Sequence, residues 1–295
     1  MHDRQVKTMS DSKSKMSGKT RILILLILLG LCIALVAVFA IGLYLEVRTT
    51  RQGQSFYTSI PVEHRPRMKE PAQSPSGGTQ PQEQPEPSGD AQGGDFGAQP
   101  DEPDEKVHVP FMDFNEARSA FPDIVAWIQS AGTVINYPVV QGTDNDYYLS
   151  HLPDLSSNKM GSVFLDYRSA PDFSGQIMLI YGHNMKSEDI FGSLKNYHDQ
   201  SYFDQHDSMY IFTPYADYLL VIVAGYILDS AYEIPPLSFE DSDGFDKYIT
   251  DVRNRSVFKS SASIEYGDQI VFLCTCATRG VKSERFVLAC KLVKL

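Results

Sequence analysis

The sequence predicts a mainly β domain, either a sandwich or a barrel, that opens with short helices and contains one late helix. Three observations predict it. From residue 133 onward, apolar residues recur with a period near two, and β-branched residues accumulate. Clusters of Gly, Pro, Asn and Asp separate seven or eight such segments, as is typical of sandwiches and barrels. Between the last long segments, the apolar period changes to that of a helix.

The expected strands share apolar runs bounded by turn residues: TVINYPVVQ, GSVFLDY, QIMLIYGH, SMYIFTP, DYLLVIVAGYIL, QIVFLCTC and RFVLACKLV. Two short helices are expected within residues 111–129, whose apolar residues recur at spacings of three and four: Phe114, Ala117, Phe121, Ile124, Val125 and Ile128. Pro122 marks a break between them or the first turn of the second. The late helix is expected within residues 238–256, behind a cap at Ser242 or Asp243.

An uncharged apolar segment, residues 22–45, lies near the N-terminus. As a helix it is about 36 Å long, which exceeds the ~30 Å hydrocarbon core of a bilayer. A cleaved signal has a shorter apolar region, so a retained transmembrane anchor is favoured, although Ala-Val-Phe-Ala at residues 37–40 leaves cleavage open. Residues 1–21 carry six basic and two acidic side chains, which predicts a cytoplasmic N-terminal tail and an extracytoplasmic domain.

Residues 46–106 are expected to form a disordered stalk rich in Pro, Gln and Gly. Most of this stretch lacks aliphatic residues and cannot bury enough apolar surface to offset the entropy of ordering. Its proline-rich part, residues 52–106, has an end-to-end distance of about 40 Å as a flexible coil of about 55 residues. It therefore holds the globular domain, residues 107–295, away from the membrane.

Charge and cysteine content exclude several function classes. The net charge of −11, without a Lys/Arg stripe outside the extreme N-terminus, excludes a nucleic-acid binder. Cys32 lies in the apolar segment, which leaves an odd number of exported cysteines and predicts a free thiol. The cysteine spacing suits neither zinc nor a C-x-x-C redox pair. The triplet at residues 144–146, Asp-Asn-Asp, is interpreted as a turn, so neither a metal nor another cofactor is expected.

Residues 269–293 carry the strongest chemical pattern. They predict a strand that ends at Cys276, a polar loop over residues 277–284 and a return strand that begins at Arg285. The thiol and the guanidinium then lie at the same end of two adjacent strands. A nearby cation favours the reactive thiolate, and a fixed guanidinium can bind the oxyanion formed when a carbonyl is attacked. A structural cysteine beside a surface arginine is the alternative.

His183 is the histidine best placed to serve that thiol. It ends an apolar strand after Tyr181 and Gly182, which is a suitable position for proton transfer. His151, His198 and His206 lie in polar segments that are interpreted as surface loops.

These residues resemble the sortases, the cell-wall transpeptidases of Gram-positive bacteria. The shared motifs are a Y-G-H-N-M strand end, an L-x-T-C strand end and an arginine nine residues after the cysteine. More narrowly, the chain from about residue 111 to its end is similar to class B sortases, through these segments: FPDIVAWIQSAGTVINYPVVQGTDNDYYLSH, GSVFLDYRS, YGHNM and FGSLKNY.

The resemblance implies a closed eight-stranded β-barrel with N-terminal helices and a helix before the catalytic strand. It also implies that Cys276 attacks the Thr carbonyl of a sorting signal in a secreted protein and forms a thioacyl enzyme. His183 then exchanges protons with the leaving and incoming amines, and Arg285 binds the oxyanion. Thr275 and Asn184 are expected near the substrate, although Thr275 also suits a plain strand position. The expected acceptor is an amine of a peptidoglycan precursor or a pilin lysine.

Two departures from the family pattern affect these expectations. Phe272 stands where the motif usually has Thr, and it is interpreted as packing. Ala277 and Thr278 follow the cysteine where some class B members have an acidic residue, so a carboxylate that orients His183 is not expected there. Cys274 lies on the same strand face as Cys276, about 6.5–7 Å along the strand, and is interpreted as a small buried apolar residue, with a resolving thiol as the alternative. Cys290 lies on the strand face opposite Arg285 and is expected in the core.

Two other functions remain compatible with the sequence. A cysteine hydrolase would use water as the acyl acceptor, and the chain itself does not specify the acceptor. A surface adhesin or scaffold without catalytic activity would use the same anchor and stalk.

Overall fold

The computed structural model describes residues 18–61, 65–66, 112–228, 234–276 and 285–295. The chain divides into two compact units, Met1–Gln52 and Gly53–Leu295. The predicted basic tail through residue 17, the stalk from residue 67 onward and the loop over residues 277–284 therefore lie outside the described residues.

Helix α1, Gly18–Ser59, is the one helix within the described ranges that is long and apolar enough to cross a membrane. Its apolar side chains from Ile22 to Val47 are exposed, as a lipid-facing helix requires. With 42 residues it is about 63 Å long, twice the thickness of a hydrocarbon core. Its composition and length are compatible with a single-pass anchor.

The expectation that a disordered stalk begins at residue 46 was wrong. Residues 46–59 continue α1, and Tyr57 and Ile60 are buried in the core of the second unit. The segment contains no proline, and Gly53, Tyr57 and Ile60 recur at helical spacing. The proline-rich composition downstream of residue 65 concealed this shorter helical pattern.

The expectation of a second N-terminal helix in the domain was also wrong. Helix α2, Phe114–Ala120, forms behind Asp113, whose carboxylate accepts the backbone N–H groups of Asn115 and Glu116. After it comes strand β1, Ile124–Gln129, which pairs with a strand on each side. A short, mostly buried apolar run has the same composition in a strand as in a helix, so the spacing of three and four was not decisive.

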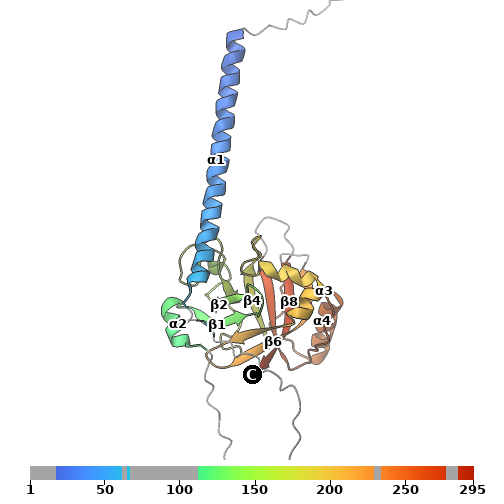
Figure 1. Ribbon diagram of the computed structural model, residues 1–295. Coiled ribbons are helices and arrows are strands. Elements are labelled where there is room, and N and C mark those ends of the chain that lie inside the picture. The colour runs from blue at the N-terminus through green and yellow to red at the C-terminus, as the bar shows by residue number, and fades with distance from the viewer. Residues whose placement is uncertain (1–17, 62–64, 67–111, 229–233, 277–284) are drawn as a thin grey trace, which may run out of the picture. The chain divides into compact units, whose positions relative to one another are not determined.

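Eight strands close into a barrel in the order β1-β2-β3-β4-β7-β8-β6-β5. Figure 1 labels β1, β2, β4, β6 and β8 of this barrel. The pairs β2–β3 and β4–β7 are parallel, and the others are antiparallel. The remaining strands are β2 Asn136–Val140, β3 Val163–Leu165, β4 Ile177–His183, β5 Ser208–Phe212, β6 Asp217–Leu228, β7 Gln269–Cys276 and β8 Arg285–Lys294. The expected mainly β fold is thus a barrel, and the seven expected strands are confirmed.

Short helices lie between the strands: η2 Tyr147–Leu149, η3 Gly192–His198, α3 Gln200–Gln205 and α4 Ser242–Asn254. Helix α4 confirms the late helix that the sequence predicts before β7. Its cap is Asp241, one residue earlier than expected, because the Asp241 carboxylate accepts the N–H of Gly244 at 2.8 Å.

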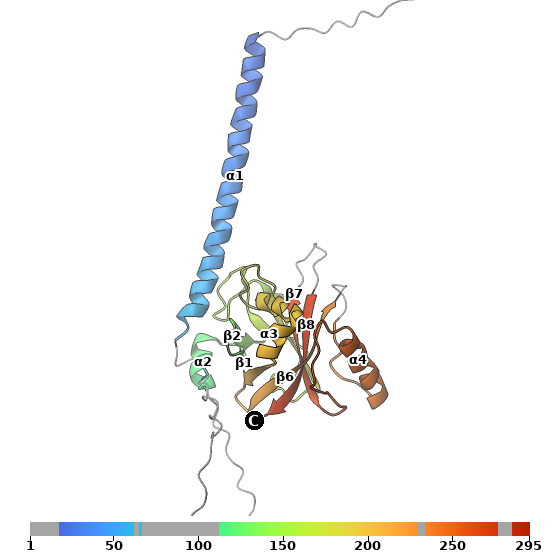
Figure 2. The same cartoon turned by 45° about the vertical axis from the view of Figure 1, so that its right-hand side comes forward.

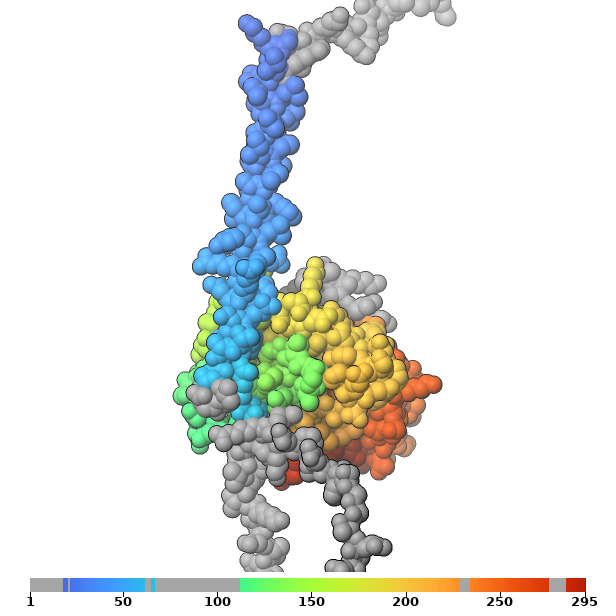
Figure 3. All heavy atoms as spheres, viewed as in Figure 1, coloured from blue at the N-terminus to red at the C-terminus, as the bar shows by residue number. Residues whose placement is uncertain are grey.

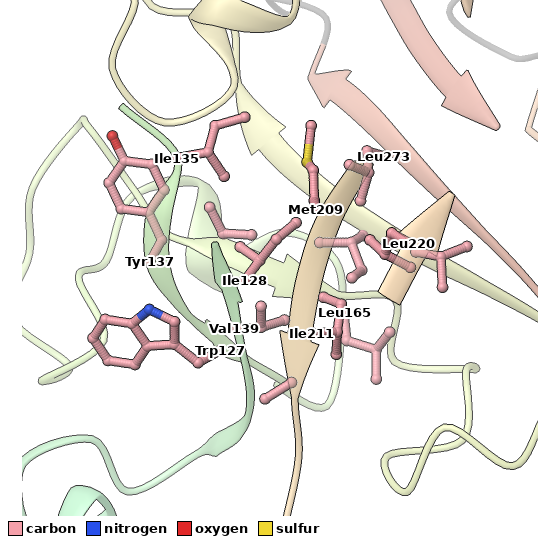
Figure 4. Close-up of a cluster of buried hydrophobic side chains, with 14 of the residues drawn as sticks. Trp127, Ile128, Ile135, Tyr137, Val139, Leu165, Met209, Ile211, Leu220 and Leu273 are labelled. Atoms are coloured by element: carbon pink, nitrogen blue, oxygen red, sulfur yellow. The ribbon is translucent and has the colours of Figure 1, made fainter. Parts of the chain in front are cut away.

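The two faces of the barrel wall have separate apolar clusters. Inside, side chains from opposite strands meet, among them Ile128, Val139, Ile211 and Leu273 (Figure 4). The outer cluster joins α4 to the wall: Phe245, Ile249, Val252, Phe272, Cys274 and Val287. Cys290 belongs to the inner cluster, where burial raises the pKa of its thiol. Both Cys274 and Cys290 are buried, as the sequence predicts.

Asp166, directly after β3, is a fully buried carboxylate beneath the end of β4. It accepts hydrogen bonds from Asn145, Arg168 and the hydroxyl of Tyr181. Burial would raise the pKa of Asp166, but the hydrogen bonds from Arg168 and Asn145 and the charge of Arg168 outweigh it and hold this pKa below its usual value. The ionised form therefore stabilises the native state.

We expect Asp166→Asn to lower the free energy of unfolding by about 2–3 kcal/mol at pH 7, since it leaves a partly buried guanidinium without its charge partner. A depressed carboxyl pKa stabilises the fold above the unfolded pKa, near 4, so the difference from wild type should shrink as pH falls below about 4. Urea unfolding followed by fluorescence of Trp127, the single tryptophan, measures it. Asp172→Asn, at an exposed carboxylate bonded to Ser174, is the control and should change little.

Candidate active site

Three strand ends meet at one end of the barrel wall. In the parallel β4–β7 ladder, His183 is the direct partner of Cys276. In the antiparallel β7–β8 pair, Cys274 lies opposite Val287, so Cys276 and Arg285 are each two residues further toward the same end. Neighbouring strands are ~4.8 Å apart, which brings the three backbones within about 10 Å. Figure 2 shows β7 and β8 side by side.

His183 is half-buried and is held by a main-chain group. Its Nε2 atom lies 2.6 Å from the carbonyl oxygen of Leu149. A carbonyl only accepts hydrogen bonds, so Nε2 carries the proton, and Nδ1 is the nitrogen left for proton exchange. The Leu149 carbonyl thus orients the imidazole, the task that a carboxylate performs in a catalytic triad.

Gly161 allows the main chain to approach His183 closely. Its φ of +62° is one that L side chains rarely adopt. A Cβ atom there would lie 2.6 Å from the Tyr148 carbonyl oxygen, 3.0 Å from the Leu149 carbonyl oxygen and 3.0 Å from His183 Cδ2. Sequence reasoning missed both Leu149 and Gly161, and a glycine just before a strand was the available signal.

Arg285 begins β8 opposite Leu228, at the edge of the pair that β8 forms with β6. Its Nε atom is buried and has no hydrogen-bond partner among the described residues. A buried donor is costly to leave without a hydrogen-bond partner.

The two predicted substrate contacts differ in their surroundings. Thr275 is buried, and its hydroxyl accepts the N–H of Phe286 at 2.8 Å, which joins β7 to β8 beside Cys276 and Arg285. Asn184 is exposed immediately after β4, where it forms an isolated bridge with Ile190.

Three other histidines among the described residues pack on aromatic neighbours. His151 stacks on Tyr147 with ring centroids 3.9 Å apart, and His206 stacks on Tyr202 at 4.3 Å. His198 lies against Phe286. In the 144–146 triplet, the Asp144 carboxylate accepts the N–H groups of Asp146 and Tyr147, which confirms the predicted turn and lowers the pKa of Asp144.

Comparison with known proteins identifies the family, although no family model matches the chain. Sortase B of Listeria monocytogenes is 33% identical over 172 residues, which cover 58% of this chain and 70% of the relative. The chain belongs to the sortase B family. A Bacillus anthracis protein described as similar to sortase B aligns at TM-score 0.58 and 32% identity, over 62% of this chain and 83% of that one.

Two further sortase B structures, the Staphylococcus aureus enzyme with its substrate and a complex with triglycine, each align at TM-score 0.59 and 27% identity. Each alignment covers 62% of this chain, with 85% and 86% of the respective structures. The class B resemblance and the closed eight-stranded barrel that it implies are therefore confirmed, and the chain is a sortase-type transpeptidase.

Proposed function

We propose that this sortase is a membrane-anchored cysteine transpeptidase in which Cys276 is the nucleophile, His183 the proton carrier and Arg285 the oxyanion ligand. The observation that carries the proposal is the register of three strands: His183 pairs directly with Cys276, and Arg285 begins the strand on the other side. The buried Nε of Arg285, without a partner among the described residues, supports its role as a ligand.

In the first half-reaction, the Cys276 thiolate attacks the Thr carbonyl carbon of a sorting signal. The oxyanion that forms binds the guanidinium of Arg285, which stabilises charge where it develops. Nδ1 of protonated His183 gives its proton to the leaving amine as the C–N bond breaks. A thioester between Cys276 and Thr remains, and the released peptide leaves with the proton.

In the second half-reaction, an acceptor amine attacks the thioester, and His183 Nδ1 takes the amine proton. The new amide forms as the thiolate leaves, which restores the starting state. We infer that the acceptor is a peptidoglycan precursor, with a pilin lysine as the alternative. The known sortase B complexes with substrate and with triglycine support a peptide donor and an amine acceptor. Thr275 and Asn184 are proposed to contact the donor peptide.

The proposed location is the cytoplasmic membrane, with the catalytic domain outside. The length and apolar surface of α1 support a single-pass anchor. The basic residues before its apolar segment favour a cytoplasmic N-terminus.

Product analysis tests the proposal. The full chain in detergent micelles is given peptides that carry candidate sorting signals, with triglycine or a lysine peptide as the amine. We expect an amide product that joins the donor at Thr to the amine. Hydrolysis alone, across all amines, would favour the cysteine hydrolase, and no cleavage in any mixture would favour a scaffold. Mass spectrometry of surface proteins from a strain that lacks the chain would then identify its natural donor and acceptor.

A further inference from the structure

The last turns of α1 are part of the second unit and contact the loop that orients His183. The Tyr57 hydroxyl donates a 2.8 Å hydrogen bond to the carbonyl oxygen of Gly161. Gly161 is the residue that lies against both the Leu149 carbonyl and the His183 ring. Figure 3 shows this end of α1, in light blue, lying against the green surface of the domain.

The same turns also hold the loop that follows His183. Gln54 donates a 2.8 Å hydrogen bond to the Asp189 carboxylate. The Tyr57 ring packs edge-on against Tyr137 at 5.1 Å, and the Tyr137 hydroxyl accepts the N–H of Ile190 at 3.0 Å.

The backbone of the loop that follows His183 is strained, and the contacts with Gln54 and Tyr137 help to hold it. Glu188 and Ile190 have φ values of +66° and +58°. A β-branched residue such as Ile190 rarely adopts this region, and strained backbone persists where its surroundings over-determine it. Because Phe191 N–H bonds back to the His183 carbonyl, a shift of the loop is transmitted to the end of β4.

Arg65 and Ile60 hold the C-terminal end of α1 in place. Arg65 donates hydrogen bonds to the carbonyl oxygens of Tyr57 and Ile60, at 2.9 and 3.1 Å, which satisfies carbonyl groups at the helix terminus. Ile60 is buried in the same core as Tyr57. Tyr57 and Gln54 are therefore presented from a fixed element.

We propose that Tyr57 and Gln54 are positioning residues for His183, so that the domain-proximal end of the anchor helix is a working part of the active site. The inference rests on the proposed role of His183. Tyr57 fixes Gly161, and thereby the Leu149 carbonyl that sets the imidazole tautomer. Gln54 and the Tyr57 ring fix the loop on the other side of His183. Neither side chain acts on the reacting atoms.

Tyr57→Phe tests the proposal in the full chain, because it removes one hydroxyl and keeps the ring contacts. We expect kcat for acylation to fall about tenfold while KM stays within twofold, as for a misoriented proton carrier. The pH profile of kcat should also shift. Tyr215→Phe, at an exposed tyrosine, is the matched control and should leave kcat and the profile unchanged. If Tyr57→Phe lowers the melting temperature strongly, Gln54→Ala takes its place, with the same expected result.

A second readout does not depend on acyl transfer. The rate at which iodoacetamide alkylates Cys276, followed at each pH by peptide mass spectrometry, reports its thiolate. We expect His183→Ala and Tyr57→Phe to move this pH dependence in the same direction. The inference is overturned if Tyr57→Phe behaves like Tyr215→Phe in both assays, or if His183→Ala leaves the alkylation profile unchanged. If the wild-type chain transfers no acyl group to any amine, while His183→Ala and Tyr57→Phe still move the alkylation profile in the same direction, the proposed acceptor chemistry fails and the inference stands.

Discussion

Cys276→Ala should abolish transfer, with kcat/KM reduced at least about 10³-fold, because the covalent intermediate can no longer form. The measurement is the rate of amide product from a sorting peptide and triglycine. Peptide binding should persist within a few-fold, since the substitution removes one sulfur atom and leaves the rest of the site in place.

The matched control is Cys274→Ala, two residues earlier on the same strand. Its thiol is buried in the outer cluster, so its loss should cost some stability but little activity. Residual activity of Cys276→Ala within tenfold of wild type, or a comparable loss in Cys274→Ala at equal stability, would contradict the assignment of the nucleophile.

Arg285→Met should reduce kcat by about 10²- to 10³-fold with a smaller change in KM, because its guanidinium acts mainly on the charge that develops in the transition state. The kcat of Arg285→Lys should be less than tenfold higher than that of Arg285→Met. An ammonium group lacks the planar fork of a guanidinium and cannot replace a buried Nε–H. Single-turnover acylation of the full chain separates this effect from binding.

Arg253→Met is the control for the arginine series. Arg253 is exposed on α4 and donates to the carbonyl of Ala262, away from the strand ends. It should retain full activity. An Arg285→Met enzyme with normal kcat and a raised KM would limit the role of Arg285 to uniform substrate binding.

Much of the barrel could be predicted from the sequence, because alternation and turn residues are local signals. The strands that end at Cys276 and begin at Arg285 follow from one polar loop between two apolar runs. Strand β1 was misassigned because a short buried run has no decisive period. The end of α1 was misassigned because its few apolar residues become informative only when a core is present to receive them.

The pairing of His183 with Cys276 could not be read from local patterns. It arises from a parallel ladder between β4 and β7, whose strands are separated by more than 80 residues, and only the family resemblance indicated it. The support of His183 was less predictable still. The Leu149 carbonyl is a main-chain group without a side-chain signature, and Tyr57 reaches Gly161 across 104 positions of sequence.

The most direct test of the central claim is the mass of the trapped intermediate. The full chain is mixed with a sorting peptide in the absence of an amine, quenched in acid and digested for mass spectrometry. We predict a hydroxylamine-sensitive acyl group, ending in the Thr of the peptide, on Cys276. An adduct on Cys274 or Cys290, or peptide cleavage that passes through no covalent intermediate, would contradict it.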